Sequence, residues 1–227
     1  MNLLLIAATS AEIAPLTEYL PKNWTTSQEG TFVKADIRLS LLITGVGMVS
    51  TAYHLTKALS NHTYDLVLLL GIGGSFDRNI PLGDVVFVTT ERYGDMGSED
   101  HYNFLDVFEL GLEQLHQPPF SGGILPNALQ NLPVPIGLPE VAGISINTVA
   151  GTSFTADARE NKYGPQVESM EGAAFHYVCL LESLPFAQVR AISNYVEARD
   201  KSKWQIPDAV QSLNQWAISF LEGLTSS

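Results

Sequence analysis

Short apolar runs alternate along the chain with segments of helical spacing. Six runs have the length and the flanking Gly, Pro or Asp residues that are typical of strands: Asn2–Ala8, Leu39–Thr44, Asp65–Leu70, Asp84–Thr89, Val141–Val149 and Phe186–Ile192. Four other segments carry apolar residues at helical spacing: Glu12–Leu20, Val49–Leu59, Met170–Leu184 and Asp208–Leu224. This alternation predicts an α/β fold with a largely parallel sheet covered by helices. The length of 227 residues fits a single domain, 1–227.

The same pattern predicts where a ligand binds. Ligands of such sheets bind at the carboxyl ends of the strands. The segments that follow the apolar runs are Thr9–Glu12, Gly45–Met48, Gly71–Ser75, Gly151–Thr155, Glu168–Glu171 and Ser193–Asp200. They hold most of the uncommon chemistry of the chain. The stretch Gly111–Pro139, rich in Pro, Gly and Gln, is expected to run over the surface as a long excursion.

Charge and cysteine content narrow the function classes. The formal net charge is −12, so phosphate backbones and anionic membranes repel the chain, and neither nucleic acid nor a membrane is an expected partner. A single cysteine, Cys179, allows no internal disulfide and suits a reducing compartment. The sequence has no apolar run of transmembrane length, and its first strand lacks the features of a signal peptide. We therefore expect a cytoplasmic protein.

Two glycine-rich segments each allow two interpretations. Gly45-Val-Gly-Met-Val-Ser50 lacks the third glycine of a dinucleotide-binding turn, so a tight strand-to-helix turn is the better interpretation. Gly71-Ile-Gly-Gly-Ser75 ends a very apolar run and lacks the Gly-Lys-Ser/Thr ending of a phosphate-binding loop. It is either a flexible turn or, as we favour, a turn that faces a ligand.

Acidic and polar side chains follow two of the later runs. Glu171 precedes a helical segment, where an acid is favoured by the helix dipole, but its carboxylate could equally accept two hydrogen bonds from a ribose diol. Arg190 lies in the apolar part of its strand and needs a carboxylate partner. Asn194 could cap a turn or face a ligand. The five histidines have no metal-ligand spacing, so neither a metal nor another cofactor is expected.

Taken together, these segments resemble the nucleoside phosphorylase/nucleosidase family. The segments that carry the resemblance occur in the family's order along nearly the whole chain: Ala8–Glu12, Gly45–Met48, Gly71–Ser75 with Leu82–Asp84, Gly151–Phe154, Val167–Gly172 and Arg190–Asn194. Methylthioadenosine/S-adenosylhomocysteine nucleosidases look similar, and the stretch Ser98–Gly111 looks more like futalosine hydrolases than like the wider family. The resemblance implies a single three-layer α/β/α domain with a mixed twisted sheet, a purine nucleoside as the small-molecule partner, and a homo-oligomer.

The resemblance also implies a role for each site residue. Glu12 would be the general base that activates water, with Arg190 close to that water and to the carboxylates. Glu171 would bind the sugar hydroxyls and Met170 would pack on the sugar. Phe154 would stack on the purine, and the backbone of Thr155 would hydrogen-bond its edge. Asn194 would contact the N7 region of the base. The remaining expected substrate-binding residues are Val46, Ile72 and Gly73.

Two positions decide the reaction and the base. Phosphorylases of this family have a phosphate-binding Arg near the end of the first strand, whereas this chain has Glu12, which repels phosphate and can accept a proton from water. Adenine-cleaving nucleosidases have Asp where this chain has Asn194. An amide matches the donor at N7 and the acceptor at O6 of a 6-oxopurine leaving group. Asn194 therefore points to a hypoxanthine-type leaving group, and the resemblance to futalosine hydrolases implies that the substrate is futalosine, whose hydrolysis is a step of one route to menaquinone.

Several alternatives remain open at this point. They are a purine nucleoside phosphorylase, a nucleosidase for methylthioadenosine-type substrates, and a purine-binding module without catalysis. The benzoate end of futalosine requires a basic or amide partner, for which Arg92, Arg159 and Lys162 are the candidates.

Overall fold

A mixed sheet forms the centre of the molecule. The computed structural model describes residues 1–27, 30–101, 103–127 and 134–225. The strand order of the main sheet is β11-β10-β6-β12-β5-β1-β4-β3-β2, with β9 paired to β6, while β7 and β8 form a separate hairpin. The strands are β1 (Asn2–Ala7), β2 (Thr25–Thr26), β3 (Phe32–Lys34), β4 (Ile37–Ile43), β5 (Leu66–Ser75), β6 (Val85–Glu91), β7 (Gly97–Asp100), β8 (Asn103–Asp106), β9 (Leu125–Pro126), β10 (Glu140–Ser145), β11 (Val167–Ser169) and β12 (Phe186–Tyr195).

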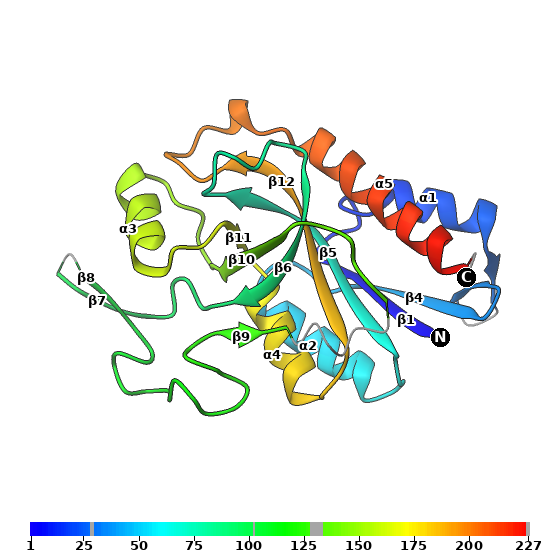
Figure 1. Cartoon of the computed structure of the whole chain (residues 1–227), viewed down its shortest axis with the longest axis horizontal. Helices are drawn as coiled ribbons and strands as arrows, with labels where there is room; N and C mark the ends of the chain where they lie inside the picture. Colours follow the sequence, from blue (N-terminus) through cyan, green and yellow to red (C-terminus); the bar gives the residue numbers. More distant parts are fainter. Residues whose placement is uncertain (28–29, 102, 128–133, 226–227) are drawn as a thin grey trace.

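Helices cover both faces of this sheet. They are α1 (Ala14–Asn23), α2 (Met48–Leu59), α3 (Ser153–Tyr163), α4 (Gly172–Leu181) and α5 (Ile206–Thr225), with a short 3₁₀ helix at Lys201–Lys203. Figure 1 shows α1 and α5 side by side on one face and α2 and α4 on the other. The three-layer α/β/α architecture expected from the sequence is confirmed.

The alternation of side chains along β1 explains the two-sided core. Leu3 and Leu5 are fully buried and pack with the apolar side chains of α1 and α5. Leu4 and Ile6, one residue out of phase, pack with Leu55 of α2 and with the apolar side chains of α4. Successive strand residues point to opposite faces, so a continuous apolar run is needed where both faces are covered.

The sheet partly closes on itself at the end that carries the site. β12 runs parallel to β5 and antiparallel to β6, and β10 is parallel to both β6 and β11. β11 then pairs antiparallel with the last residues of β5. Because of this closure, the carboxyl ends of β5 and β12 lie directly beside the short strand β11.

Three sequence-based expectations need correction. The run Val141–Val149 ends as a strand at Ser145. The N–H of Ile146 still donates to the carbonyl of Ser169, but the N–H groups of Asn147 and Thr148 donate to the carboxylate of Asp95 and not to a neighbouring strand. The segment Gly71–Ser75 is not a turn but the second half of β5. Helix α3 was not expected at all, since only Ala156 and Arg159 of its residues are buried and no apolar periodicity marks it.

The other long segments follow the prediction more closely. Gly45 and Gly47 make the expected tight turn, with φ of +83° and +93°, and Gly47 caps α2. The part of the excursion 111–139 that the structure describes contains only the two-residue strand β9, and residues 128–133 lie outside the described residues. Within the described chain, no helix is long and apolar enough to cross a membrane.

Candidate active site

Glu12 is held in the turn that joins β1 to α1. Its side chain is 9% exposed. Oε2 accepts hydrogen bonds from the backbone N–H of Thr9 at 2.9 Å and from the Thr9 hydroxyl at 3.0 Å, while Oε1 accepts from the N–H of Ile72 at 3.2 Å. The buried amide of Asn214 in α5 fixes the turn, because its Nδ2 donates to the carbonyl of Glu12 and its Oδ1 accepts from the N–H of Leu16. The carboxylate is therefore fixed in position at the carboxyl ends of β1 and β5.

Arg190 and Glu171 form a buried ion pair beside Glu12. Arg190 lies in β12 and is 1% exposed, and Glu171 at the start of α4 is 4% exposed. Nη1 of Arg190 donates to Oε2 of Glu171 at 3.2 Å and to the carbonyl of Ile72 at 3.2 Å. Oε1 of Glu171 accepts from the N–H of Gly47 at 3.1 Å. Glu171 makes no side-chain capping bond to its own helix. Its carboxylate therefore binds Arg190 and Gly47 and not the end of α4.

Glycines of β5 make room for these groups. A Cβ atom on Gly71 would lie 2.3 Å from Nη1 of Arg190 and 3.1 Å from Oε1 of Glu12. The guanidinium and the Glu12 carboxylate therefore approach the same point above the strand. Nε and Nη2 of Arg190 are buried and have no hydrogen-bond partner among the described residues.

Asn194 ends β12 on the opposite side of the same cavity. Its Oδ1 accepts from the Ser193 hydroxyl at 2.8 Å, and its Nδ2 donates to the carbonyl of Tyr195 at 3.1 Å. Ser193 is itself anchored on the carbonyl of Gly73 at 3.2 Å. The amide is thus oriented by its neighbours in the strand.

A cavity of about 310 Å³ joins these groups. This volume is at the lower end of the range for small-molecule sites. Seven of the ten residues expected from the sequence line it: Glu12, Val46, Ile72, Gly73, Met170, Glu171 and Asn194. Further lining residues include Thr9, Ile146, Val149, Ser169, Ser193, Trp204, Ile206 and Val210. The wall is mostly apolar and carries its polar groups at two places, near Glu12 and near Asn194.

The three remaining expected residues lie elsewhere. Arg190 sits beneath the cavity and acts on it through Glu171 and Ile72. Phe154 is 63% exposed at the start of α3 and does not line the cavity. The N–H of Thr155 donates to Oγ1 of Thr152, which caps the same helix. In this structure α3 therefore does not bring Phe154 and Thr155 to the cavity wall.

Glu168 belongs to the segment Glu168–Glu171, which was expected to face a ligand, but no role was predicted for this residue. Glu168 in β11 is 5% exposed and lines the cavity near Asn194. Burial raises the pKa of Glu168 to about 7, against the opposing effect of Arg159, and the carboxylate of Asp95 raises it further. Its place beside Asn194 could not be predicted, because this place depends on the pairing of β11 with β5.

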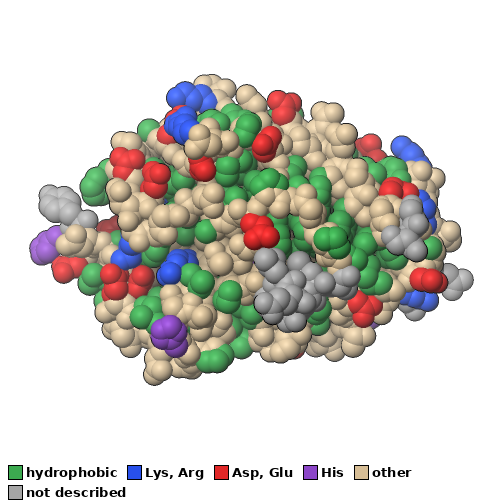
Figure 2. Space-filling view, in the orientation of Figure 1, with side chains coloured by type: hydrophobic (Ala, Val, Ile, Leu, Met, Phe, Trp, Pro, Cys, Tyr) green, Lys and Arg blue, Asp and Glu red, His purple; other side chains and the backbone are tan. Residues whose placement is uncertain are grey.

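The basic residues considered for the benzoate end are engaged elsewhere. Arg92 donates to the carbonyls of Gly122 and Gly123, and Arg159 to the carbonyl of Thr148. Lys162 donates to the carbonyl of Phe104 and forms an ion pair with the carboxylate of Glu109. Among the described residues, no Lys or Arg lines the cavity. The face of the molecule drawn in Figure 2 carries few Lys and Arg side chains, in keeping with the acidic net charge.

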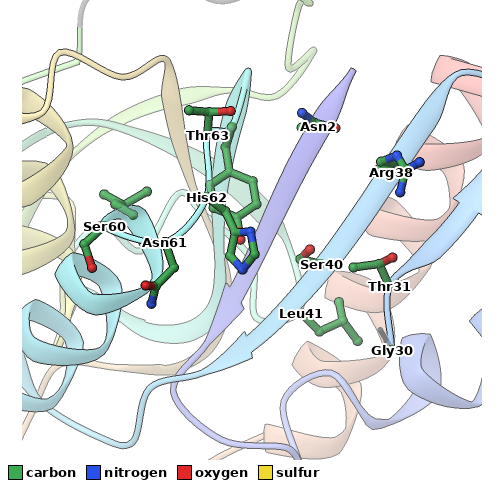
Figure 3. Close-up of a pocket in the computed structure, with 12 residues that line it drawn as sticks. Asn2, Gly30, Thr31, Arg38, Ser40, Leu41, Ser60, Asn61, His62 and Thr63 are labelled. Carbon is green, nitrogen blue, oxygen red and sulfur yellow. The ribbon is translucent and has the colours of Figure 1, made fainter. Parts of the chain in front are cut away.

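A larger hollow lies at the other end of the strands. It measures about 870 Å³ and is lined by residues that include Asn2, Arg38, Ser40, His62 and Tyr64 (Figure 3). Asn2 begins β1 and Tyr64 lies just before β5, so this hollow is at the amino ends of the strands. It contains none of the carboxylates described above. Among the described residues, no three His, Cys, Asp or Glu side chains gather as a metal site would require.

The comparisons with known proteins agree with this geometry. Residues 2–224 match the model of the Phosphorylase superfamily, and the chain belongs to that family. A futalosine hydrolase from Streptomyces coelicolor is 32% identical, with 94% of this chain and 92% of that protein covered. A 5′-methylthioadenosine/S-adenosylhomocysteine nucleosidase from Haemophilus ducreyi is 28% identical, with 82% and 81% covered. The native structure of a Helicobacter pylori futalosine hydrolase has a TM-score of 0.78 at 16% identity, with 98% of each chain covered.

Proposed function

We propose that this chain hydrolyses the N-glycosidic bond of futalosine and releases hypoxanthine. The observation that carries the proposal is the placement of Glu12, the Glu171–Arg190 pair and Asn194 around one cavity of nucleoside size. The likeness to curated futalosine hydrolases over most of both chains supports the choice of substrate. The chain acts, in this proposal, as one domain inside the cell.

The carboxylates act at the sugar end. Glu171, oriented by Arg190 and by the N–H of Gly47, accepts hydrogen bonds from the sugar hydroxyls. As the bond from C1′ to N9 breaks, the sugar develops oxocarbenium character and the base leaves with the bonding electrons. Glu12 takes a proton from the water that adds to C1′. Catalysis consists of positioning and charge stabilisation, without a covalent intermediate.

The groups around Glu12 favour water over phosphate as the nucleophile. Glu12 and Glu171 are both carboxylates, and among the described lining residues there is no cation. Arg190 is already paired with Glu171. A phosphate dianion at this place would meet two like charges, whereas a neutral water can donate to the Glu12 carboxylate.

The base is chosen at the other end. When a 6-oxopurine leaves, it takes up a proton from solvent at N7, which balances the proton that Glu12 removes from the attacking water, and it presents N7–H and O6 together on one edge. The acceptor and the donor of the Asn194 amide match this pair. A 6-aminopurine would place two donors there, and each mismatched buried group costs about 1–3 kcal/mol, or roughly tenfold or more in selectivity.

A second copy of the chain is proposed to cover the mouth of the cavity. Val46 lines the mouth and is 54% exposed, and Val49 and Tyr53 on α2 are 84% and 61% exposed. These three exposed apolar residues are three and four positions apart at the start of α2, and exposed apolar residues that gather in this way mark interaction surfaces. The proposal predicts that Val49→Glu shifts the protein to a smaller species in sedimentation velocity. A wild-type monomer at micromolar concentration would contradict it.

The experiment that tests the proposed function measures base release by chromatography. The wild-type protein is incubated with futalosine, inosine or methylthioadenosine, each with and without phosphate. Hypoxanthine from futalosine, at a rate independent of phosphate, is the expected result. Adenine release from methylthioadenosine at a higher kcat/KM would make the protein an adenine-specific nucleosidase, and strict dependence on phosphate would make it a phosphorylase. Release from none of the three would leave a binding module.

A further inference from the structure

One row across the sheet places Glu168 and Asn194 on either side of a glycine. Glu168 of β11 pairs with Gly74 of β5, and Gly74 stands next to Asn194 of β12. Paired positions project to the same face of a sheet, so the two side chains flank a position that has none. A Cβ atom on Gly74 would lie 3.1 Å from Nδ2 of Asn194 and 3.4 Å from Cγ of Glu168. The amide and the carboxyl group therefore share one part of the cavity wall.

The carboxyl group of Glu168 forms an ion pair with Arg159 that lacks a hydrogen bond. Its Oε2 is buried without a hydrogen-bond partner among the described residues, and the same is true of Nη1 of Arg159. These two atoms are 3.6 Å apart, which is longer than the hydrogen-bonded contact of a close carboxylate–guanidinium pair. Buried polar atoms without a partner are rare in native proteins. Oε2 is turned toward Arg159, and no described residue donates a hydrogen bond to the carboxyl group, so this group of the cavity wall can still accept a hydrogen bond from a ligand.

The chemistry of the base identifies that donor. In a 6-oxopurine, N7, O6 and N1–H follow one another along the same edge of the ring. If the Asn194 amide binds N7–H and O6, the next group along the edge is N1–H, a donor that a carboxylate accepts. Adenine has no hydrogen on N1 and offers an acceptor there instead. A carboxylate beside Asn194 therefore favours the 6-oxopurine a second time.

We propose that Glu168 binds the N1–H group of the base and sets the preference for 6-oxopurines together with Asn194. This inference rests on the proposed function, since it assigns one more contact to the same base. It extends the specificity from a single amide to a pair of side chains, from β11 and β12, that bind three neighbouring hydrogen-bonding groups along one edge of the base: N7–H, O6 and N1–H.

The test compares two bases by isothermal titration calorimetry at pH 8. Hypoxanthine has N1–H, and 1-methylhypoxanthine carries a methyl group in its place. The wild-type protein is expected to bind hypoxanthine about 10- to 100-fold more tightly, as the loss of a hydrogen bond to a charged group implies. In Glu168→Leu this preference should fall to within about threefold, mainly because hypoxanthine binds more weakly.

Two further variants separate base recognition from a structural role. Glu168→Gln keeps the shape of the side chain, and its amide can accept from N1–H of hypoxanthine or donate to N1 of adenine. This variant should therefore have a smaller preference for hypoxanthine over adenine. It provides the test even if Glu168→Leu does not fold. Asp95 is the other carboxylate next to Arg159, at 3.7 Å, and it does not line the cavity. Asp95→Asn should therefore leave the ratio of the affinities for hypoxanthine and 1-methylhypoxanthine unchanged.

Two results would overturn the inference. One is equal affinity of the wild-type protein for hypoxanthine and 1-methylhypoxanthine. The other is an undiminished preference for hypoxanthine, either over adenine in Glu168→Gln or over 1-methylhypoxanthine in a folded Glu168→Leu protein. Because the titration requires no turnover, these results are distinct from a failure of the proposed function, which would show as absence of hypoxanthine release from futalosine by the wild-type protein.

Discussion

The ion pair of Glu171 and Arg190 provides the sharpest test of how the site is built. Both side chains are at least 95% buried, and Nη1 of Arg190 lies 3.2 Å from Oε2 of Glu171. Removing one partner of a buried pair leaves an uncompensated charge, which costs about 3–5 kcal/mol. Glu171→Gln keeps an acceptor for the N–H of Gly47, and Glu12 remains close to the guanidinium. We therefore expect Glu171→Gln to lower the free energy of unfolding by about 3 kcal/mol, the lower end of this range.

The double variant Glu171→Gln/Arg190→Met removes both charges at once. Its free energy of unfolding should be at least about 2 kcal/mol higher than the value expected from adding the losses of the two single variants. Groups in direct contact show coupling energies of this order. The measurement is urea unfolding at pH 7.5 for the four proteins of the cycle. The exposed pair of Lys203 and Glu197, at 2.8 Å, serves as the control, with an expected coupling below about 1 kcal/mol.

Activity gives the second readout of the same variants. Glu171→Gln should lower kcat/KM for futalosine by about 10- to 100-fold, because the sugar hydroxyls lose a charged acceptor. The double variant should regain stability without regaining this activity. Additive stabilities, with a coupling under about 0.5 kcal/mol, would refute the claim that the two groups act as a buried pair.

Three further predictions follow from particular contacts. Asn194→Asp should shift the ratio of kcat/KM toward adenine nucleosides by about tenfold or more, measured with futalosine and its 6-amino analogue, and an unchanged ratio would remove Asn194 from base selection. Gly71→Ala should displace Arg190, which lies 2.3 Å from the added Cβ, and lower the free energy of unfolding by about 1–3 kcal/mol together with kcat; a fully active, equally stable variant would contradict the close approach. Burial raises the pKa of Glu91 to about 7 from 4.5, so its contribution to stability is full below pH 4.5 and is lost as the pH rises through 7. Between pH 5 and 8 the free energy of unfolding, measured with urea, should therefore fall by about 3 kcal/mol in the wild-type protein and by less in Glu91→Gln. An equally steep fall in the variant would exclude Glu91 as its cause.

The sequence predicts the elements whose burial leaves a periodic pattern. β1, β5 and β12 are marked by apolar runs, and α2 and α5 by helical spacing. Helix α3 leaves no such pattern, because it packs through Ala156 and the paired side chain of Arg159. Its missing signal shows that a polar surface helix is fixed by long-range contacts that periodicity does not record.

The candidate site divides in a similar way. The need of a buried Arg190 for a carboxylate partner could be predicted from its place in an apolar run, and the structure supplies Glu171. The segment Glu168–Glu171 was expected to face a ligand, but the place of Glu168 beside Asn194 could not be predicted, because it depends on the antiparallel pairing of β11 with the end of β5. Gly71–Ser75 looked like a turn, since glycine in a sequence indicates conformational freedom more often than a close approach of side chains from neighbouring strands.

The most direct test of the central claim is the rate of hypoxanthine release from futalosine in phosphate-free buffer, measured for the wild-type protein and for Glu12→Gln. The account predicts steady release by the wild-type protein. It predicts a fall of about 10²- to 10⁴-fold in kcat for the variant, with the affinity for hypoxanthine nearly unchanged, because the amide cannot accept the proton from water. Release by Glu12→Gln at the wild-type rate, or no release by the wild-type protein without phosphate, would contradict it.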